Sequence, residues 1–454
     1  MKLINPATEE LIQEINADTI ESVLNKYESA KRAQGAWAQR PIRERIECIK
    51  RFHDLIEKNQ ESLAHDLTRE VGKPIQEALN ELNGARTRIR YFLENAEKWL
   101  SPNPVRIDGT TEEVLSFDPL GVIANISAWN YPYLVGVNVF IPALISGNAV
   151  LYKPSEFSTI TGLNIERLLQ EAGVPREVFT AVLGDYQVGE CLLDLPLDGY
   201  FFTGSYKTGK HIAERVASKL VPVGLELGGK DPLYVTDEVA DLKQVANAVA
   251  EGCFYNNGQS CCAVERVYVH EKVYDAFIPL FEQEVKSLKV GDPMDRNHQQ
   301  GSLTRPAQAA FLESQISDAL SNGAKLLCGG KRIPGKGAFF EPTVLLNVSH
   351  QMKVMKDESF GPIIGVMKVK SDEEAIQLMN DSEYGLTAAV YSKNRERAQD
   401  LLSKVNSGTA YINCCDRVSP YLPWAGRKHS GLGATLSFLG ILAFTKPRGW
   451  HLRA

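Results

Sequence analysis

From about residue 120 onward, short apolar segments alternate with longer segments of helical periodicity, and this feature constrains the fold most strongly. Such alternation predicts an α/β fold with parallel sheets, because parallel strands need a crossover connection that is usually a helix. The predicted strands lie at 121–127, 148–154, 179–185, 199–205, twice within 221–235, and at 266–270, 363–370, 386–392 and 408–413. The predicted helices between them lie at 159–173, 206–220, 372–383 and 395–405.

The first part of the chain follows a different pattern. Charged and apolar residues recur at spacings of three and four between residues 17 and 100, which predicts mainly helices. Residues 101–121 are rich in proline and glycine and contain short alternating stretches, which indicates a β excursion between larger units. The sequence contains no tandem repeat and no low-complexity tract. We therefore predict two α/β units and a β excursion.

A span without Asp, Glu, Lys or Arg runs from Pro119 to Tyr152. A membrane helix needs about 20 continuous apolar residues, whereas four asparagines, two prolines and several glycines interrupt this span. It is better interpreted as a buried strand, a polar loop and a buried helix. The N-terminus also lacks the basic and apolar regions of a signal peptide, so we expect a cytoplasmic protein without a membrane partner.

Charge and composition argue against nucleic-acid binding, a disulfide framework and a local metal site. The formal net charge is −6 and the isoelectric point is near 5.9, which argues against a nucleic-acid-binding protein because phosphate neutralisation needs a basic surface. Eight cysteines are too few and too scattered for a disulfide framework in 454 residues. There is no C-x-x-C motif and no close pair of histidines, so local spacing predicts no metal site.

The segment from Gly204 to His211 nearly matches a phosphate-binding loop. It fits G-x-x-x-x-G-K, but His211 stands where Ser or Thr must bind magnesium. Gly204 and Ser205 still follow a predicted strand and begin a predicted helix, where free N–H groups and the helix dipole favour a phosphate. No G-x-G-x-x-G lies between a strand and a helix, so the standard dinucleotide fingerprint is missing.

Cys261 and Cys262 stand next to each other after the polar stretch N-N-G-Q-S. Adjacent Cα atoms lie about 3.8 Å apart, but unstrained disulfides need roughly 4.4–6.8 Å, so a structural disulfide is excluded. Two core cysteines remain an alternative. The following residues, AVERV at 263–267, look helical and predict a helix N-terminus, which lowers a thiol pKa and favours a nucleophile.

Six motifs in order closely resemble the signatures of the aldehyde dehydrogenase superfamily. The resemblance covers essentially the whole chain, from NPATEE at 5–10 to PWAGRKHSGLG at 423–433. The motifs are WNYP at 129–132, KPSE at 153–156, FTGS at 202–205, LELGGK at 225–230, FYNNGQSCCAVER at 254–266 and ESFGP at 358–362.

This resemblance implies a role for each matching residue. Cys261 is the expected nucleophile, Glu226 the general base and Asn130 an oxyanion donor together with the backbone N–H of Cys261. The expected cofactor-binding residues are Ile126, Trp129, Lys153, Glu156, Gly204, Ser205, Leu227, Glu358 and Phe360. The expected substrate-channel residues are Tyr131, Leu134, Tyr255, Ser260, Cys262 and Trp424.

The resemblance also implies the domain organisation. Residues 1–100 and 120–228 are expected to form a Rossmann-like NAD-binding domain, and residues 229–430 a catalytic domain. Residues 101–119 and 431–454 are expected to form an oligomerisation segment of a homodimer or homotetramer. The tail TKPRGWHLRA is short and basic where the family commonly has an oligomer-forming strand, which leaves the choice between dimer and tetramer open.

The expected reaction converts an aldehyde to its carboxylic acid through a thiohemiacetal and a thioester on Cys261. Glu226 activates the water that cleaves the thioester, and its apolar setting should raise its pKa. Family members that transfer the acyl group to coenzyme A lack this glutamate, so its presence argues against the acylating alternative. A non-catalytic binding protein, the other alternative, would not require Cys261, Asn130, Glu226 and Glu358 together.

A few residues indicate which cofactor and which substrate to expect. A carboxylate at Glu156 bonds a ribose 2′-hydroxyl and repels a 2′-phosphate, so we expect NAD, with NADP as the alternative. Aromatic channel residues favour an apolar or aromatic aldehyde, whereas Arg417 favours a carboxylate and Asp416 weakens that charge. The usual P-F-G-G-x-K motif is Pro-Trp-Ala-Gly-Arg-Lys at 423–428, so the channel wall differs from that of the family.

Overall fold

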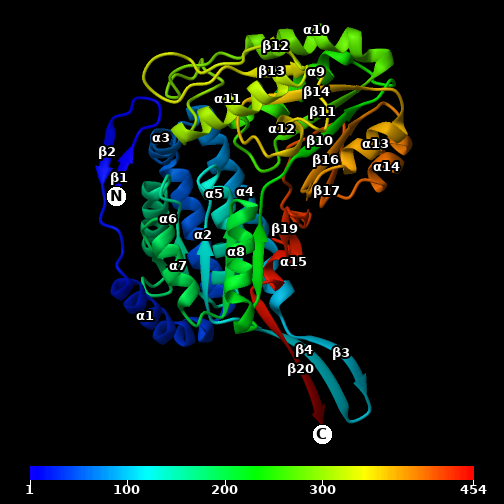
Figure 1. Ribbon diagram of the computed structural model, residues 1–454. Helices are drawn as coiled ribbons and strands as arrows, with labels where there is room; N and C mark the ends of the chain where they lie inside the picture. Colours follow the sequence, from blue (N-terminus) through cyan, green and yellow to red (C-terminus); the bar gives the residue numbers. More distant parts are fainter.

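The computed structural model describes all 454 residues and contains two large, mainly parallel sheets, each the centre of one α/β unit (Figure 1). In the first sheet, only the edge strand β19 is antiparallel to its neighbour. Its order is β19 (Gly431–Leu432), β9 (Val223–Glu226), β8 (Gly199–Thr203), β5 (Val122–Ile126), β6 (Ala149–Lys153) and β7 (Phe179–Ala181).

Helices cover both faces of this first sheet because its strands alternate their buried side chains. Val122 and Ala124 pack with one group of helices, while Ile123 between them packs with the other. The first group is α1 (Ile20–Gln39), α7 (Tyr186–Asp194) and α8 (Tyr206–Val216), with the short 3-10 helix η1 (Ala217–Lys219) after it. The second is α2 (Ile42–Lys58), α3 (Gln60–Val71), α4 (Ile75–Leu100), α5 (Pro132–Ile145) and α6 (Thr159–Glu171).

The uncharged span folds as predicted, with β5, a loop, helix α5 and β6. Helix α5 is buried on nearly every side between the sheet and α4, which explains why it carries no charge. No helix of the structure is both long and apolar enough to cross a bilayer.

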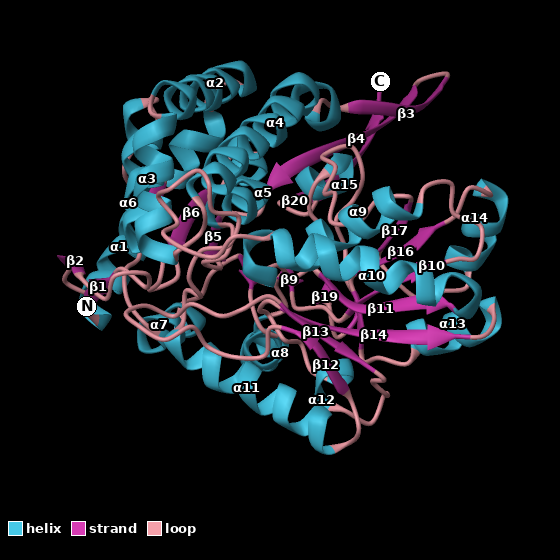
Figure 2. Ribbon diagram, turned by 90° about the horizontal axis from the view of Figure 1, so that it is seen from above, coloured by secondary structure: helices cyan, strands magenta, loops and turns pink.

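The second sheet is parallel except where β12 pairs with β13. Its order is β12 (Lys325–Cys328), β13 (Thr343–Leu346), β14 (Ile363–Val369), β11 (Val264–His270), β10 (Asp231–Val235), β16 (Thr387–Tyr391) and β17 (Thr409–Ile412). One face packs against α9 (Leu242–Phe254) and α10 (Glu271–Ser287). The other packs against α11 (Pro306–Ser321), α12 (Lys353–Lys356), α13 (Asp372–Asn380) and α14 (Arg395–Ser403), with the sheet seen among them in Figure 2.

A three-stranded antiparallel sheet extends away from both units (Figure 1). It consists of β3 (Asn103–Asp108), β4 (Thr111–Pro119) and the C-terminal strand β20 (Thr445–Arg453). Four small pieces complete the chain: the hairpin β1 (Lys2–Ile4) and β2 (Leu11–Glu14), the 3-10 helix η2 (Tyr255–Gly258), the pair β15 (Tyr384–Gly385) and β18 (Arg427–Lys428), and helix α15 (Ser437–Leu442).

Every strand and helix named above from the sequence after residue 120 is present, and residues 20–100 are almost entirely helical. One expectation is wrong. Residues 263–267 do not form a helix, because Val264 begins strand β11, a fully buried central strand. Val264, Val267 and Val269 of β11 pack into one face of the sheet core, so β-branched burial outweighs the helical appearance of this short segment. Cys261 therefore lies in a turn before a strand.

Candidate active site

Two cavities adjoin each other, and only Cys261 and Glu226 contribute to the walls of both. One has a volume of about 370 Å³ and is lined by helix α4, the start of α5 and residues 416–420; we call it the α4 cavity. The other has a volume of about 380 Å³ and includes the N-terminus of α8; we call it the α8 cavity. A molecule in one cavity can therefore meet a molecule in the other at Cys261 and Glu226.

The loop before Cys261 has an unusual backbone conformation. Asn256, Asn257 and Gly258 have φ angles of 54°, 56° and 67°, in the left-handed region that Asn and Gly tolerate best. A Cβ on Gly258 would lie 2.4 Å from the carbonyl oxygen of Gly361, so only glycine fits there. The sequence N-N-G thus sets the turn that presents Cys261.

Hydrogen bonds fix this loop against the segment that carries Asn130. The side-chain amide of Asn130 donates to the carbonyl of Gln259 at 3.1 Å. In return, the Asn256 amide donates to the carbonyl of Asn130 at 3.3 Å. The second N–H of Asn130 and the backbone N–H of Cys261 have no acceptor in the protein. Both residues line the α8 cavity, where such free donors can stabilise an oxyanion.

The structure separates the two adjacent thiols. Cys261 is half-buried and reaches both cavities, whereas Cys262 is buried and lines only the α4 cavity. The Cys262 thiol donates to Asp416 Oδ1 at 2.9 Å. The neighbouring Cys261 thiol, burial and the Asp416 carboxylate raise the pKa of Cys262 well above its usual value. Cys262 therefore stays protonated at neutral pH, which leaves Cys261 as the accessible thiol.

Glu226 ends strand β9 at the boundary between the cavities. Its carboxylate accepts a hydrogen bond from the hydroxyl of Thr435. Desolvation by the surrounding protein raises the pKa of Glu226 to about 7, against the opposite effects of Thr435 and of the Arg88 charge. A carboxyl group with this pKa is half ionised near neutral pH and suits a general base.

The α8 cavity has the features of a nucleotide site. Ser205 caps helix α8, and the backbone N–H groups of Tyr206 and Lys207 have no acceptor in the protein, as a phosphate group requires. The rings of Trp129 and Phe360 meet edge to face at a centroid distance of 5.5 Å in the wall. These residues therefore fit a dinucleotide whose pyrophosphate lies at α8.

Glu358 lies in the same cavity and accepts a hydrogen bond from the backbone N–H of Gly229 at 3.0 Å. A Cβ on Gly228 would lie 2.4 Å from the carboxylate oxygens of Glu358, so a glycine is required beside it. Burial and the nearby Glu265 charge raise the pKa of Glu358 to about 8.

Most of the predicted site residues lie together. All six predicted channel residues line the α4 cavity, and six of the nine predicted cofactor residues line the α8 cavity. The other three lie outside the wall of that cavity, beyond the carboxyl ends of neighbouring strands. Ile126 ends β5 directly opposite Lys153, which ends β6, and Glu156 follows three residues later with a hydrogen bond from Ser155 at 3.2 Å.

Buried charged side chains on α4, and one just before this helix in the sequence, hold the segments that form the site. Lys73 and Glu81 form an ion pair with no exposed side-chain surface. Glu81 also accepts the backbone N–H of Tyr133 at 2.8 Å, at the start of α5. Glu77 accepts the backbone N–H of Asn256 at 2.9 Å. These carboxylates thus hold both segments that converge on Cys261: the start of α5 beyond Asn130 and the turn at Asn256.

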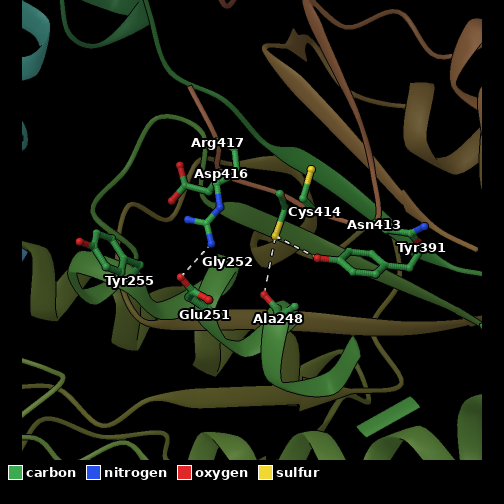
Figure 3. Close-up of a pocket in the computed structure, with 10 residues that line it drawn as sticks. Ala248, Glu251, Gly252, Tyr255, Tyr391, Asn413, Cys414, Asp416 and Arg417 are labelled. Carbon is green, nitrogen blue, oxygen red and sulfur yellow. Dashed lines mark hydrogen bonds and ion pairs between the residues drawn. The ribbon is translucent and has the colours of Figure 1, made fainter. Parts of the chain in front are cut away.

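Arg417 is engaged at the surface. Its guanidinium donates to Glu251 at 3.2 Å across a third cavity of about 220 Å³, and Figure 3 shows the two side chains directed toward each other. The two side chains keep 65% and 49% of their surface exposed, so Arg417 is a solvated ion-pair member. The structure contains no group of three or more His, Cys, Asp or Glu side chains placed to hold a metal ion.

Sequence reasoning missed three residues of the site: Thr435, Glu81 and Arg88. Thr435 follows no motif that marks it, and the structure alone brings it to Glu226. Glu81 and Arg88 belong to a helix whose charged residues are usually interpreted as a solvated face. Their spacing of seven places them on the same side of α4, which is the one detectable pattern.

Comparisons with known proteins agree with this geometry. Residues 1–449 match the aldehyde dehydrogenase family. The chain is 34% identical to a succinate-semialdehyde dehydrogenase [NADP(+)] of Deinococcus radiodurans, over 98% of this chain and 93% of that protein. It is 34% identical to the peroxisomal aminoaldehyde dehydrogenase 1 of Pisum sativum, over 99% and 93%.

Solved structures are similar over the whole chain. An NADP-dependent enzyme of E. coli superposes with a TM-score of 0.97 at 31% identity, over 100% of this chain and 94% of that one. A betaine aldehyde dehydrogenase from Staphylococcus aureus in complex with NAD+ superposes with a TM-score of 0.96 at 31% identity, over 100% and 92%.

Proposed function

Because the chain belongs to the aldehyde dehydrogenase family and oxidises an aldehyde to its acid with NAD or NADP, we propose which residues carry out this reaction. Cys261 is the nucleophile, Glu226 the general base, and Asn130 and the backbone N–H of Cys261 the oxyanion donors. The observation that supports this assignment is that Cys261 and Glu226 alone line both cavities. The aldehyde occupies the α4 cavity and the nicotinamide the α8 cavity.

The reaction begins when the Cys261 thiolate attacks the aldehyde carbon and forms a thiohemiacetal. The two free N–H groups at Asn130 and Cys261 stabilise the negative oxygen. A nicotinamide held beside Trp129 and Phe360 would supply the hydride acceptor that this step needs, and Cys261 would then carry the acyl group as a thioester. Glu226 then removes a proton from water, the water oxygen attacks the thioester carbon, and the acid departs as the Cys261 sulfur is released.

The same geometry favours release of a free acid over transfer to coenzyme A. The acylating alternative needs no general base for water, whereas Glu226 lines the cavities with a pKa of about 7 and a hydrogen bond from Thr435 that orients it. The non-catalytic alternative would require neither this carboxylate nor an accessible thiol beside it.

We assign cofactor binding to residues of the first unit and to Glu358 and Phe360 of the second. Ser205 and the N-terminus of α8 hold the pyrophosphate, Trp129 and Phe360 flank the nicotinamide side, and Lys153 and Glu156 hold the adenosine ribose. Residues 1–100 and 120–228 form the NAD-binding domain in this proposal, and residues 229–430 the catalytic domain. The position of the two sheets supports this division.

Assembly as a homodimer or homotetramer through residues 101–119 and 431–454 is also a proposal, as is a cytoplasmic location. The extended sheet supports the assembly because Val105, Ile107, Trp450 and Leu452 expose apolar surface on it. Residues 431–442 belong to the first α/β unit and not to the extended sheet. Strand β19 joins the first sheet, and the buried Ile441 of α15 packs in the core of that unit.

The decisive test is reduction of NAD by a panel of aldehydes, compared between the wild type and Cys261→Ala. We expect the variant to lose turnover while NAD binding, followed by quenching of tryptophan fluorescence, stays unchanged. Glu226→Gln should instead release about one equivalent of reduced cofactor rapidly and then stall at the thioester. Substantial steady turnover by Cys261→Ala would disprove the nucleophile assignment.

A further inference from the structure

Arg88 is a buried cation that forms no ion pair, although its charge acts on the carboxyl groups of Glu226 and Asp416 in the same cavity wall. It lies on α4 in the wall of the α4 cavity and is only 7% exposed. Nη1 donates to the carbonyl of Leu134 at 3.1 Å and to Asn138 Oδ1 at 3.0 Å. Nε and Nη2 have no acceptor in the protein, and no carboxylate lies within 4.0 Å of the guanidinium. A buried charge of this kind is costly unless a partner binds it.

Two other buried arginines show what a structural guanidinium does in this protein. Arg266 uses all three of its nitrogens, with backbone carbonyls of Lys230, Leu378 and Met379 among the acceptors. Arg45 donates to three backbone carbonyls from Nε and Nη1. Neither lines a cavity described above. Arg88 alone among the three has no hydrogen bond from either Nε or Nη2. This edge of the guanidinium is the fork that binds a carboxylate in two parallel hydrogen bonds.

The acidic groups around this cavity have other partners. Glu81 pairs with Lys73, Asp416 accepts the Cys262 thiol at 2.9 Å, and Glu226 accepts the Thr435 hydroxyl. Arg417, the other cation of the wall, is bound to Glu251 at the surface. Arg88 is therefore the charged side chain of this wall that forms no ion pair and still has free hydrogen-bond donors, at Nε and Nη2.

We propose that Arg88 binds a carboxylate on the substrate, so that the enzyme acts on aldehydes that also carry a carboxyl group. This inference rests on the proposed function, since Cys261 in the same cavity must hold the aldehyde end. Leu134, Val135 and Trp424 supply apolar wall for the carbon chain between the two ends. From the sequence, the aromatic channel residues favour an apolar aldehyde and Arg417 favours a carboxylate. A carboxylate bound by Arg88 inside the cavity accounts for both, because the apolar wall then contacts the carbon chain and Arg417 is not needed for binding.

The test compares aldehydes that differ only by a carboxylate in place of a methyl group. Succinate semialdehyde is paired with butanal, and 4-carboxybenzaldehyde with 4-methylbenzaldehyde. We expect the wild type to prefer the carboxylate member of each pair. Arg88→Gln should lower kcat/KM for that member about 10- to 100-fold, mainly through KM, because a charge-assisted pair is lost. Because the Arg88 charge also lowers the pKa of Glu226, all rates are compared well above that pKa, where Glu226 is ionised in every variant. The methyl members should then change less than about threefold, and Arg88→Lys should lie between because it keeps the charge without the fork.

Arg90→Gln is the matched control, because Arg90 is exposed on the same helix and lines neither cavity. Circular dichroism and thermal melting establish that each variant is folded. Equal losses for both members of a pair in Arg88→Gln, or a wild type that prefers the methyl members, would overturn the proposal.

A binding measurement separates this inference from the proposed function. Succinate, titrated calorimetrically into the wild type, should bind, and Arg88→Gln should abolish the binding while Arg90→Gln keeps it. If no aldehyde reduced the cofactor, the proposed function would fail, and the succinate titration would still decide the carboxylate site. Failure of succinate to bind the wild type, together with turnover of butanal, would refute the carboxylate site alone.

Discussion

Thr435 donates a hydrogen bond to Glu226 across a separation of 209 residues in the sequence. The strand β19 just before Thr435 pairs with β9, with Gly431 opposite Glu226. Thr435 itself exchanges two backbone hydrogen bonds with Trp424, at 2.8 and 2.9 Å. The C-terminal segment of the chain thus fixes the orientation of the proposed general base.

Replacing Thr435 with Val should shift the pH dependence of thioester hydrolysis upward. The hydroxyl stabilises the ionised carboxylate and so lowers the pKa of Glu226 from what burial alone would give. Without it the pKa rises above about 7, and less base is ionised at neutral pH. The kcat measured against pH should fall several-fold near neutrality and return to the wild-type plateau at high pH. An unshifted profile would show that Thr435 does not act on the base.

Breaking the buried ion pair between Lys73 and Glu81 should cost far more stability than breaking an exposed pair that another glutamate of α4 forms. Glu81→Gln keeps an acceptor for the N–H of Tyr133 but leaves Lys73 buried and unpaired, which costs about 3–5 kcal/mol. Glu97→Gln, which breaks the exposed pair with Arg43, should cost less than about 1 kcal/mol. Unfolding in urea measures both.

A double variant identifies the cause of that loss. Adding Lys73→Met to Glu81→Gln removes the unpaired charge, so the free energy of unfolding should recover by a large part of the loss. If the double variant is instead as unstable as the sum of the two single variants, the loss comes from packing and not from the buried charge.

Stability should fall as pH rises through the titration of Glu77. Burial raises its pKa from 4.5 to about 8 in the folded protein. Between those pH values the folded state holds more protons than the unfolded state, so the free energy of unfolding decreases by up to about 1.4 kcal/mol per pH unit for one such group. Glu77→Gln, which can still accept the N–H of Asn256, should flatten the slope between pH 5 and pH 8. A slope equal to that of the wild type would contradict the assignment to Glu77.

Glu156 should determine the preference for NAD over NADP. Its carboxylate is half-buried beyond the end of β6, where it would repel a 2′-phosphate on the ribose. Glu156→Gln should therefore raise the ratio of NADP to NAD turnover, measured as kcat/KM for each cofactor at saturating aldehyde. Glu166, which is on α6 and accepts the N–H of Ala181, offers a control as Glu166→Gln; an unchanged ratio in Glu156→Gln would reject the role.

Short motifs in the sequence named most of the residues that line the two cavities. N-N-G-Q-S-C-C encodes its own turn, because Asn256, Asn257 and Gly258 take the left-handed conformation locally. The five residues after Cys262 look helical, and they do not reveal that Val264 begins a central strand. Periodicity over so few residues cannot distinguish a helix from a buried strand.

Local pattern therefore determined the parallel sheets and the turn at Cys261, and the resemblance to a known family supplied the expected nucleophile, base and oxyanion donor. Tertiary structure decided what surrounds them. Thr435 donates to Glu226, Glu81 accepts from the start of α5, and Arg88 lies in the wall of the α4 cavity without forming an ion pair. These contacts join segments far apart in the chain, and their energetics depend on desolvation. Burial is a property of the packed molecule. The local sequence therefore does not show which charged side chain becomes desolvated or which one forms an ion pair.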